Sequence, residues 1–308
     1  YEEMIEGRKL TEIINTQHEN VKYMPGVKLP ENIIADPDVL SATKDAHVLI
    51  FVLPHQFLPG LCDKIAGNHA PDCIAISLIK SVLFEEHGIT LISEQLRKGL
   101  KGMDVSVLMG ANVASEVAAG AFCETTIGYN IEANGKLCKQ IFETPLFRVS
   151  IVNDIAGVEM CGALKNAVAL AAGFVEGLDL PHNNTKAAII RIGLMEMKKF
   201  IGNHFPGVKE ETFFQSCGFA DLVVTCYAGR NRKCALEFVK AAGTKTFDQI
   251  EVELLHGQKL EGTQTCKEVM KIMRREGSTD RYPLFSSIHA VAFEGASVQS
   301  MIDTLGHA

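Results

Sequence analysis

The chain has 308 residues, and 30 Lys and Arg stand against 37 Asp and Glu, which gives a net charge of −7 at neutral pH. This acidic balance argues against a protein that binds duplex nucleic acid, because such proteins need a basic face to neutralise phosphates. The composition, with 47% hydrophobic and 22% charged residues, excludes disordered and fibrous classes, and the length predicts two medium-sized domains.

The first half of the chain alternates short apolar runs with helical stretches. Unbroken apolar runs at 47–53, 73–79 and 105–109 are typical of strands that are buried on both faces of a parallel sheet. Helical patterns cover 57–67, 90–100 and 114–121. This alternation predicts an α/β domain over residues 1–150, built on a doubly wound parallel sheet.

After a further β-rich run at 148–152, the pattern becomes helical. Asn153 or Asp154 can cap a helix over 155–177, and the segment 183–185 can cap a second helix that runs through residue 200. Further helices are predicted at 210–216, 232–242, 247–255, 265–275 and 284–305. We therefore predict a mostly α-helical domain over residues 151–308, packed against the first domain with a cleft between them.

Cysteine and histidine spacing predicts neither disulfides nor a metal site. The nine cysteines are scattered and lack Cys-x-x-Cys spacing, which is typical of reduced thiols in a reducing compartment. The ten histidines show no grouping of metal ligands. The most apolar runs also predict no membrane span, because the first, at 48–53, is too short and the second, at 160–175, carries Lys165 in its middle.

Lys165 is the only charged residue between positions 160 and 175, and Asn166 is the only other strongly polar residue there. A buried ammonium is costly unless it is paired, so Lys165 is either a core lysine held in an ion pair or a lysine that transfers a proton to a carbonyl oxygen. Glu159 lies about 120° away around the helix, so we expect the orienting carboxylate to come from elsewhere. Asp221, isolated in a small and apolar run, is the candidate.

Three other polar groups are candidate site residues. The segment Gly229-Arg230-Asn231-Arg232-Lys233 brings three cations to the start of a helix, which favours phosphate but also fits a solvated turn. Lys80 and Asn112 each follow a predicted strand, at the edge where such sheets bind ligands, although either one alone fits an ordinary loop. The Gly-bounded loop 256–262 is also polar, and a surface turn explains it equally well.

The phosphate-binding motifs that are typical of nucleotide-binding sheets are absent from this sequence. Neither Gly-x-Gly-x-x-Gly after a strand nor a Walker sequence occurs, and the chain opens at Tyr1 without an initiator Met. We expect the first strand, its Gly-rich turn and the first helix to precede Tyr1 in a longer gene product.

Motifs along most of the chain resemble the cytosolic, NAD-dependent glycerol-3-phosphate dehydrogenases of eukaryotes. They include Ser77-Leu-Ile-Lys80, Val107-Leu-Met-Gly-Ala-Asn112, Cys161-Gly-Ala-Leu-Lys-Asn166, Asn184-Thr-Lys-Ala-Ala188 and Gly229-Arg-Asn-Arg232. The resemblance implies reversible hydride transfer between NADH and dihydroxyacetone phosphate, which gives sn-glycerol 3-phosphate. It also implies a Rossmann domain, a helical substrate domain and a cytoplasmic homodimer. From the acidic charge balance and the lack of a predicted membrane span we expect no nucleic-acid or membrane partner. A catalytically silent relative that acts as a binding or regulatory protein is the alternative.

The resemblance also implies roles for individual residues. Lys165 resembles the proton donor and acceptor, Lys80 a second cation at substrate and cofactor, and Asp221 and Thr225 the residues that orient these lysines. The substrate contacts that it implies are Lys80, Asn112, Asn166, Arg230 and Asn231. The cofactor contacts that it implies are Tyr1, Phe57, Lys80, Ala114, Arg230, Lys259 and Glu261, and Glu261 stands where the animal enzymes usually have Gln.

Overall fold

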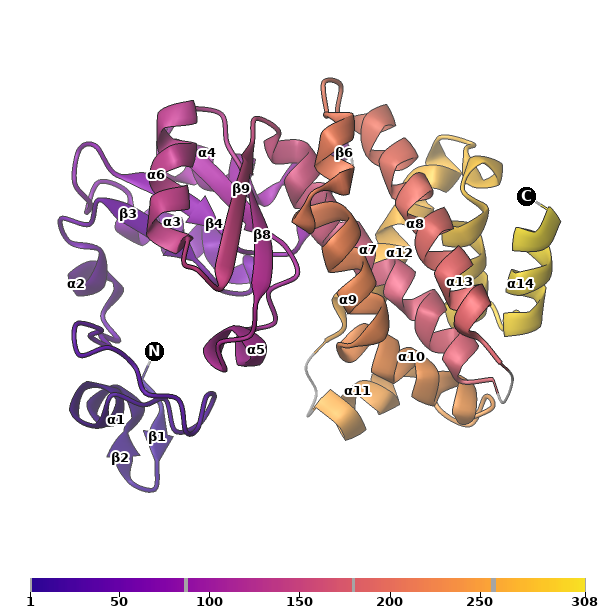
Figure 1. Ribbon diagram of the computed structural model, residues 1–308, viewed down its shortest axis with the longest axis horizontal. Coiled ribbons are helices and arrows are strands. Elements are labelled where there is room, and N and C mark those ends of the chain that lie inside the picture. The colour runs from indigo at the N-terminus through magenta and orange to yellow at the C-terminus, as the bar shows by residue number, and fades with distance from the viewer. Residues whose placement is uncertain (1, 86–87, 179–180, 256–258, 308) are drawn as a thin grey trace.

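The computed structural model describes residues 2–85, 88–178, 181–255 and 259–307 (Figure 1). An α/β half, from β1 through β9, lies beside a helical half, from α7 through α14, and the sequence prediction of this fold class is confirmed. A small lobe made of β1 (Met4–Ile5), β2 (Arg8–Lys9) and α1 (Leu10–Gln17) stands apart from the central sheet (Figure 1).

The central sheet positions Lys80 and Asn112, which follow two of its strands. Its described strands are β3 (Val48–Phe51), β4 (Ile74–Ser77), β7 (Val105–Met109), β8 (Cys123–Gly128) and β9 (Phe147–Val152), and they lie in that order across the sheet. Neighbours are parallel except β7 and β8, which are antiparallel. The sequence did not predict β8, because its two threonines resemble a polar segment. Both are buried, and the Thr125 hydroxyl donates to the carbonyl of Met109 at 3.0 Å.

The connections around the sheet differ in detail from the predicted helices. They comprise α2 (Val39–Thr43), η1 (His55–Phe57), α3 (Leu58–Ile65), α4 (Ile92–Gly99), α5 (Ala114–Ala118) and α6 (Glu132–Phe142). The predicted helix at 90–100 begins only at Ile92, because residues 88–91 form β6 (Gly88–Leu91), which pairs with β5 (Val82–Glu85) in a hairpin directly after Lys80. The hairpin therefore joins the end of β4 to α4.

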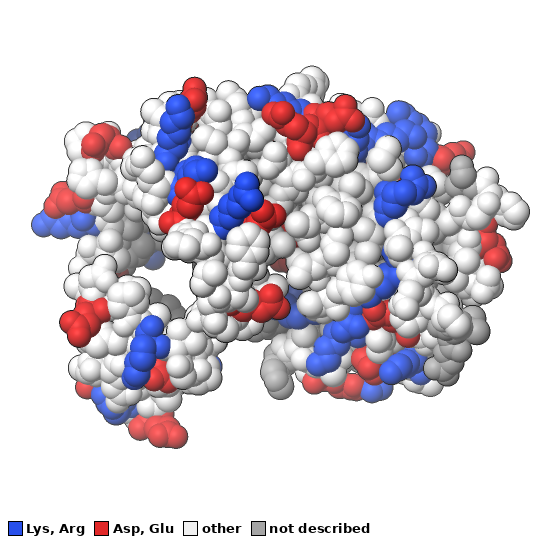
Figure 2. Space-filling model, viewed as in Figure 1, with Lys and Arg blue, Asp and Glu red and all other residues white. Residues whose placement is uncertain are grey.

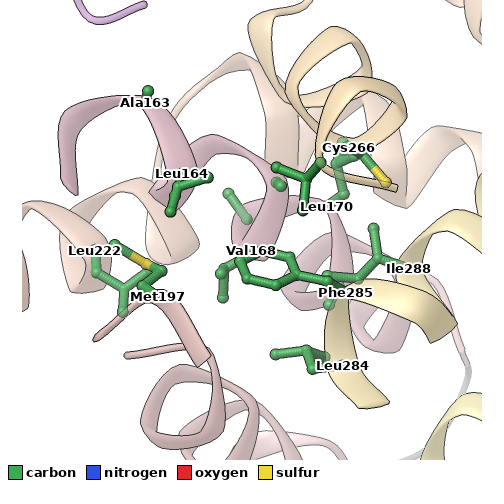
Figure 3. Packing of buried hydrophobic residues seen from close by; sticks show 14 of the residues in the cluster. Ala163, Leu164, Val168, Leu170, Met197, Leu222, Cys266, Leu284, Phe285 and Ile288 are labelled. Carbon is green, nitrogen blue, oxygen red and sulfur yellow. The ribbon is translucent and has the colours of Figure 1, made fainter. Parts of the chain in front are cut away.

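The helical half is arranged around α7 (Ile155–Glu176), in which every residue from 157 to 175 is buried. The other elements are α8 (Asn183–His204), η2 (Glu210–Phe214), η3 (Ser216–Ala220), α9 (Asp221–Tyr227), α10 (Arg230–Lys240), α11 (Phe247–Leu255), α12 (Glu261–Arg275), η4 (Thr279–Arg281), α13 (Pro283–Phe293) and α14 (Val298–His307). Figure 3 shows Val168 and Leu170 of α7 beside Phe285 of α13. Although α7 is long and apolar enough to cross a membrane, it is buried inside the protein as its core helix.

The structure confirms one predicted helix end and corrects two others. Of the two predicted caps of α7, Asn153 and Asp154, the structure selects Asp154, since its Oδ1 accepts from the backbone N–H of Gly157 at 2.8 Å. The predicted cap in 183–185 is wrong, because Asn183 is already helical and follows the N-cap residue His182. The predicted helix at 284–305 is broken between α13 and α14, where Gly295 takes a φ of +75° that favours glycine.

Candidate active site

Lys165, near the middle of α7, is 4% exposed and paired. Its ammonium donates to Oδ1 of Asp221 and to the hydroxyl of Thr225, the latter at 2.8 Å. The Thr225 hydroxyl in turn donates to the backbone carbonyl of Asp221 at 2.6 Å, so its lone pair faces the lysine. Asp221, the carboxylate that was predicted to pair with Lys165, therefore does so from a position one turn before Thr225 on α9.

The second oxygen of Asp221 faces a cation from the other half of the molecule. Lys80, just beyond β4, donates to Oδ2 of Asp221 at 3.1 Å, to the carbonyl of Gly110 at 3.0 Å and to Oδ1 of Asn112 at 3.4 Å. The neighbouring strands β4 and β7 end at the same edge of the sheet, which brings Lys80 and Asn112 together. We call Lys80, Lys165, Asp221 and Thr225 the Asp221 cluster.

The cluster changes the acidity of its buried lysine. Burial lowers the pKa of Lys165 to about 8, with Asp221 opposing this effect and the positive charge of Lys80 adding to it. Lys165 is therefore charged at neutral pH but close enough to its pKa to give up and regain a proton. Such a group, paired with Asp221 close to the carboxyl edge of the sheet, suits acid–base chemistry at a carbonyl.

Asn166 and Asn231 join three helices beside the cluster. The Nδ2 group of Asn231 donates to Oδ1 of Asn166 at 3.0 Å, and its own Oδ1 accepts from the backbone N–H of Gly262 at 3.0 Å. A Cβ at Gly262 would lie 2.5 Å from the carbonyl of Asn166, so this close approach of α12 to α7 requires glycine. Arg230, at the start of α10, is exposed and follows Gly229, whose φ is +96°.

The remaining predicted cofactor contacts lie on or next to other elements. Phe57, which ends η1 beyond β3, has an exposed ring, Ala114 begins α5, and Glu261 begins α12 with its side chain exposed. Lys259 pairs with Asp248 at 2.7 Å and with Glu251 at 2.8 Å, contacts that raise its pKa. Tyr1 and residues 256–258 of the predicted polar loop lie outside the described residues.

Two cavities differ in their relation to these residues. A cavity of about 260 Å³ is lined by His55, Ser81 and Glu261 among others, so the edge of the sheet and α12 face each other across it. A larger cavity of about 840 Å³ lies along α8 and has none of the predicted site residues in its lining. On the face drawn in Figure 2, acidic and basic side chains are spread over both halves.

Sequence reasoning missed Ser216, which ties the helical half to the edge of the sheet. Its hydroxyl donates to the carbonyl of Glu124 at 2.7 Å and accepts from the backbone N–H of Ala111 at 3.2 Å. A Cβ at Gly110 would lie 2.9 Å from the same hydroxyl, so glycine is needed where Lys80 also finds its acceptor. A lone serine between helices carries no signal for this contact. Within the part of the chain that the structure describes, no group of three His, Cys, Asp or Glu side chains could hold a metal ion.

The chain is similar to known proteins along nearly all of its length. Residues 3–134 match the family model described as NAD-dependent glycerol-3-phosphate dehydrogenase N-terminus, and residues 154–303 match the corresponding C-terminus model. The human cytoplasmic glycerol-3-phosphate dehydrogenase [NAD(+)] is 51% identical over 306 residues, which cover 99% of this chain and 86% of that protein. The mouse glycerol-3-phosphate dehydrogenase 1-like protein is 50% identical with the same coverage.

Solved structures agree with these sequence matches. The structure of glycerol-3-phosphate dehydrogenase from Saccharomyces cerevisiae superposes with a TM-score of 0.90 at 41% identity, covering 99% of this chain and 88% of that one. The glycerol-3-phosphate dehydrogenase of Plasmodium falciparum gives a TM-score of 0.90 at 40% identity, covering 96% of this chain and 83% of that one.

Proposed function

We propose a residue-level mechanism for this chain, which belongs to the NAD-dependent glycerol-3-phosphate dehydrogenase family. The chain is an oxidoreductase of that activity and NAD is its cofactor. Its reaction interconverts dihydroxyacetone phosphate and sn-glycerol 3-phosphate, with Lys165 as the proton donor and acceptor. The observation that carries the proposal is the buried Lys165, whose carboxylate partner is shared with a second lysine from the other half.

The residues at the edge of the sheet fit a dinucleotide. The apolar ring of Phe57 is 59% exposed at the carboxyl end of β3, where a flat nucleotide ring can lie against it. In this proposal Phe57, Lys80, Ala114 and Arg230 hold the cofactor, together with Lys259 and Glu261 at the start of α12 and Tyr1 at the start of the chain. NAD supplies or accepts the hydride when it is bound.

The Asp221 cluster handles the proton. During reduction, Lys165 donates a proton to the ketone oxygen, and during oxidation it takes one from the hydroxyl. Asp221 holds both lysines, and Thr225 accepts from the ammonium so that one of its hydrogens points along a fixed direction. Lys80, which is partly exposed, adds positive charge where negative charge develops on the substrate oxygen.

Substrate contacts follow from the groups beside the cluster. Arg230 offers a planar guanidinium at the start of α10, which suits a phosphate better than a point charge does. Asn231 keeps α10 against α7 and α12 through its two amide contacts and has a second amide hydrogen for the substrate. Asn112 and Asn166 flank the two lysines and complete the proposed substrate contacts.

Lys165→Met tests the acid–base role directly. The change keeps most of the side-chain volume and removes the proton, so we expect kcat for reduction of dihydroxyacetone phosphate to fall by about 100-fold or more. Thermal melting and kinetics are measured beside Lys245→Met, which removes an exposed lysine that pairs with Glu253. A fold that melts normally with kcat within about threefold of the parent would leave Lys165 as a core lysine only.

Arg230→Ala tests phosphate recognition with two substrates. If Arg230 holds the phosphate, kcat/KM for dihydroxyacetone phosphate should fall by about 100-fold or more, because binding of the non-reacting phosphate positions the carbonyl. Dihydroxyacetone, which lacks the phosphate, should be a poor substrate for the parent and hardly worse for the variant. Equal fractional losses on both substrates would assign Arg230 to the cofactor or to the fold instead.

The setting of the enzyme is inferred from its relatives. The human and bovine relatives are named cytoplasmic, and we propose a cytoplasmic location for this chain as well. We further propose that the chain forms a homodimer, and light scattering of the purified protein would measure its mass. We propose no nucleic-acid or membrane partner. The comparisons do not favour the catalytically silent alternative.

A further inference from the structure

A second buried ion cluster lies at the C-terminal end of α7. Glu176, the last residue of that helix, accepts from Nζ of Lys186 through Oε1 and from Nη1 of Arg232 through Oε2. The side chains of Glu176 and Lys186 are 10% and 3% exposed. Nζ of Lys186 also lies 4.0 Å from the centre of the Tyr227 ring. We call Glu176, Lys186, Arg232 and Tyr227 the Glu176 cluster.

The cluster holds permanent charges that are largely buried at Glu176 and Lys186, while the side chain of Arg232 is 25% exposed and Tyr227 lies at the surface. Burial raises the pKa of Glu176, but the hydrogen bonds from Lys186 and Arg232 outweigh burial and leave that pKa below its ordinary value. Glu176 is therefore ionised at neutral pH, and the ring of Tyr227 faces the ammonium of Lys186 with its electron-rich surface. Replacing such a group by apolar side chains is often neutral or stabilising, so stability alone is a weak explanation for it.

The Glu176 cluster lies next to the segment that carries Arg230 and Asn231. Tyr227 is the last residue of α9, and Arg232 is the third residue of α10, so the cluster holds both ends of the segment 228–231. This segment comprises the bend at 228–229 and the first two residues of α10, Arg230 and Asn231. The backbones of α7 and α10 are also in close contact beside the cluster, because a Cβ at Gly173 would lie 2.3 Å from the carbonyl of Arg232.

We propose that Glu176, Lys186 and Arg232 are positioning residues, which fix the segment 228–231 so that the guanidinium of Arg230 meets the phosphate of the substrate. None of the three touches the reacting atoms in this proposal. It rests on the proposed role of Arg230, and it adds a cause for the placement of that side chain. Loosening the cluster should therefore weaken recognition of the phosphate and leave proton transfer by Lys165 intact.

Glu176→Gln is the main test, because it keeps the shape and removes the charge that holds both cations. We expect KM for dihydroxyacetone phosphate to rise about tenfold with kcat within about threefold, since a displaced binding group costs positioning rather than chemistry. Inorganic phosphate should lose potency as a competitive inhibitor by a similar factor. On dihydroxyacetone, kcat/KM should stay unchanged. Glu253→Gln, which breaks an exposed ion pair on α11, is the matched control and should change none of these constants.

Two further variants keep the test decisive. Glu176→Asp retains the charge and should recover part of the phosphate affinity. Lys186→Met leaves Glu176 paired with Arg232 and serves if Glu176→Gln does not fold. Unchanged KM and phosphate inhibition in a folded Glu176→Gln or Lys186→Met enzyme would overturn the inference, as would equal losses on both substrates. If Arg230→Ala separates the two substrates while these variants do not, the inference fails and the proposed role of Arg230 survives. If Arg230→Ala also loses equally on both, that proposed role itself fails.

Discussion

Asp221 and Glu176 each face two cations, but the two clusters differ in which group changes its acidity. Asp221 lies between the halves of the molecule and pairs with Lys165 and Lys80, and burial there lowers the pKa of Lys165 to about 8. Glu176 lies wholly within the helical half, and its two partners lower the pKa of the carboxylate itself. The first cluster can therefore exchange a proton near neutral pH, whereas the second stays charged. In our two proposals, similar ion-pair chemistry therefore serves proton transfer in the first cluster and the positioning of a binding residue in the second.

The largest expected effect comes from Asp221→Asn. The change leaves two lysines close together without a carboxylate, which lowers the pKa of Lys165 further and releases its orientation. We expect kcat for reduction at pH 7 to fall by about 100-fold or more, a loss of roughly 3 kcal/mol in transition-state stabilisation. Steady-state kinetics and thermal melting are compared with Glu176→Gln, for which kcat should survive. A similar fall of kcat in both variants would erase the distinction between the clusters.

Glu159, a carboxylate whose hydrogen bonds come from neutral donors, extends the comparison. Glu159 of α7 is fully buried and caps α4 of the other half, where it accepts from the backbone N–H of Ile92 at 2.5 Å and from the hydroxyl of Ser93 at 2.6 Å. Burial raises its pKa to about 7, and the hydrogen bonds from Ser93 and Ile92 oppose this only in part. Glu159 therefore binds a proton more tightly in the folded than in the unfolded protein.

The stability of the protein should consequently fall as pH rises. Between the unfolded pKa of 4.5 and the folded value of about 7, the folded state binds more protons, so the free energy of unfolding decreases across that window and stays lower above it. Glu159 accounts for a loss of about 3 kcal/mol and Glu196, whose pKa burial also raises to about 7, for another of that order. Denaturant unfolding at pH 5 and pH 8 should show a smaller difference for Glu159→Gln than for the parent. An unchanged difference would mean that Glu159 is ionised throughout.

Sequence patterns predicted the parts of the molecule that depend on local rules. The long apolar helix, its Asp154 cap and the need of Lys165 for a distant carboxylate all follow from burial and periodicity. The antiparallel strand β8 was missed, because its buried threonines bond to a neighbouring strand and to η3 rather than to water.

Long-range contacts set the limit of such prediction for the site. The sharing of Asp221 with Lys80 joins residues 141 positions apart, and no spacing in the chain indicates it. The sequence singled out Arg232 only as one of three cations at the start of a helix and did not single out Glu176. Nothing in the sequence indicates that α8 and α10 both meet the end of α7.

The smallest expected effect is the pH dependence of the parent enzyme, and it separates the two clusters most directly. With the pKa of Lys165 near 8, kcat/KM for reduction of dihydroxyacetone phosphate should fall about tenfold per pH unit above that value, because the proton donor is lost. For oxidation of sn-glycerol 3-phosphate, kcat/KM should instead rise toward pH 8 and then level, because the neutral amine is the acceptor. Glu176→Gln should retain this inflection at its lower affinity, since the Glu176 cluster does not take part in proton transfer. Glu159→Gln should retain it too, which distinguishes Lys165 from the buried acid that titrates near 7. An inflection that moves with Glu159 and not with Asp221 would assign the kinetic titration to the contact between the halves, and Lys165 would lose its place as the acid–base group.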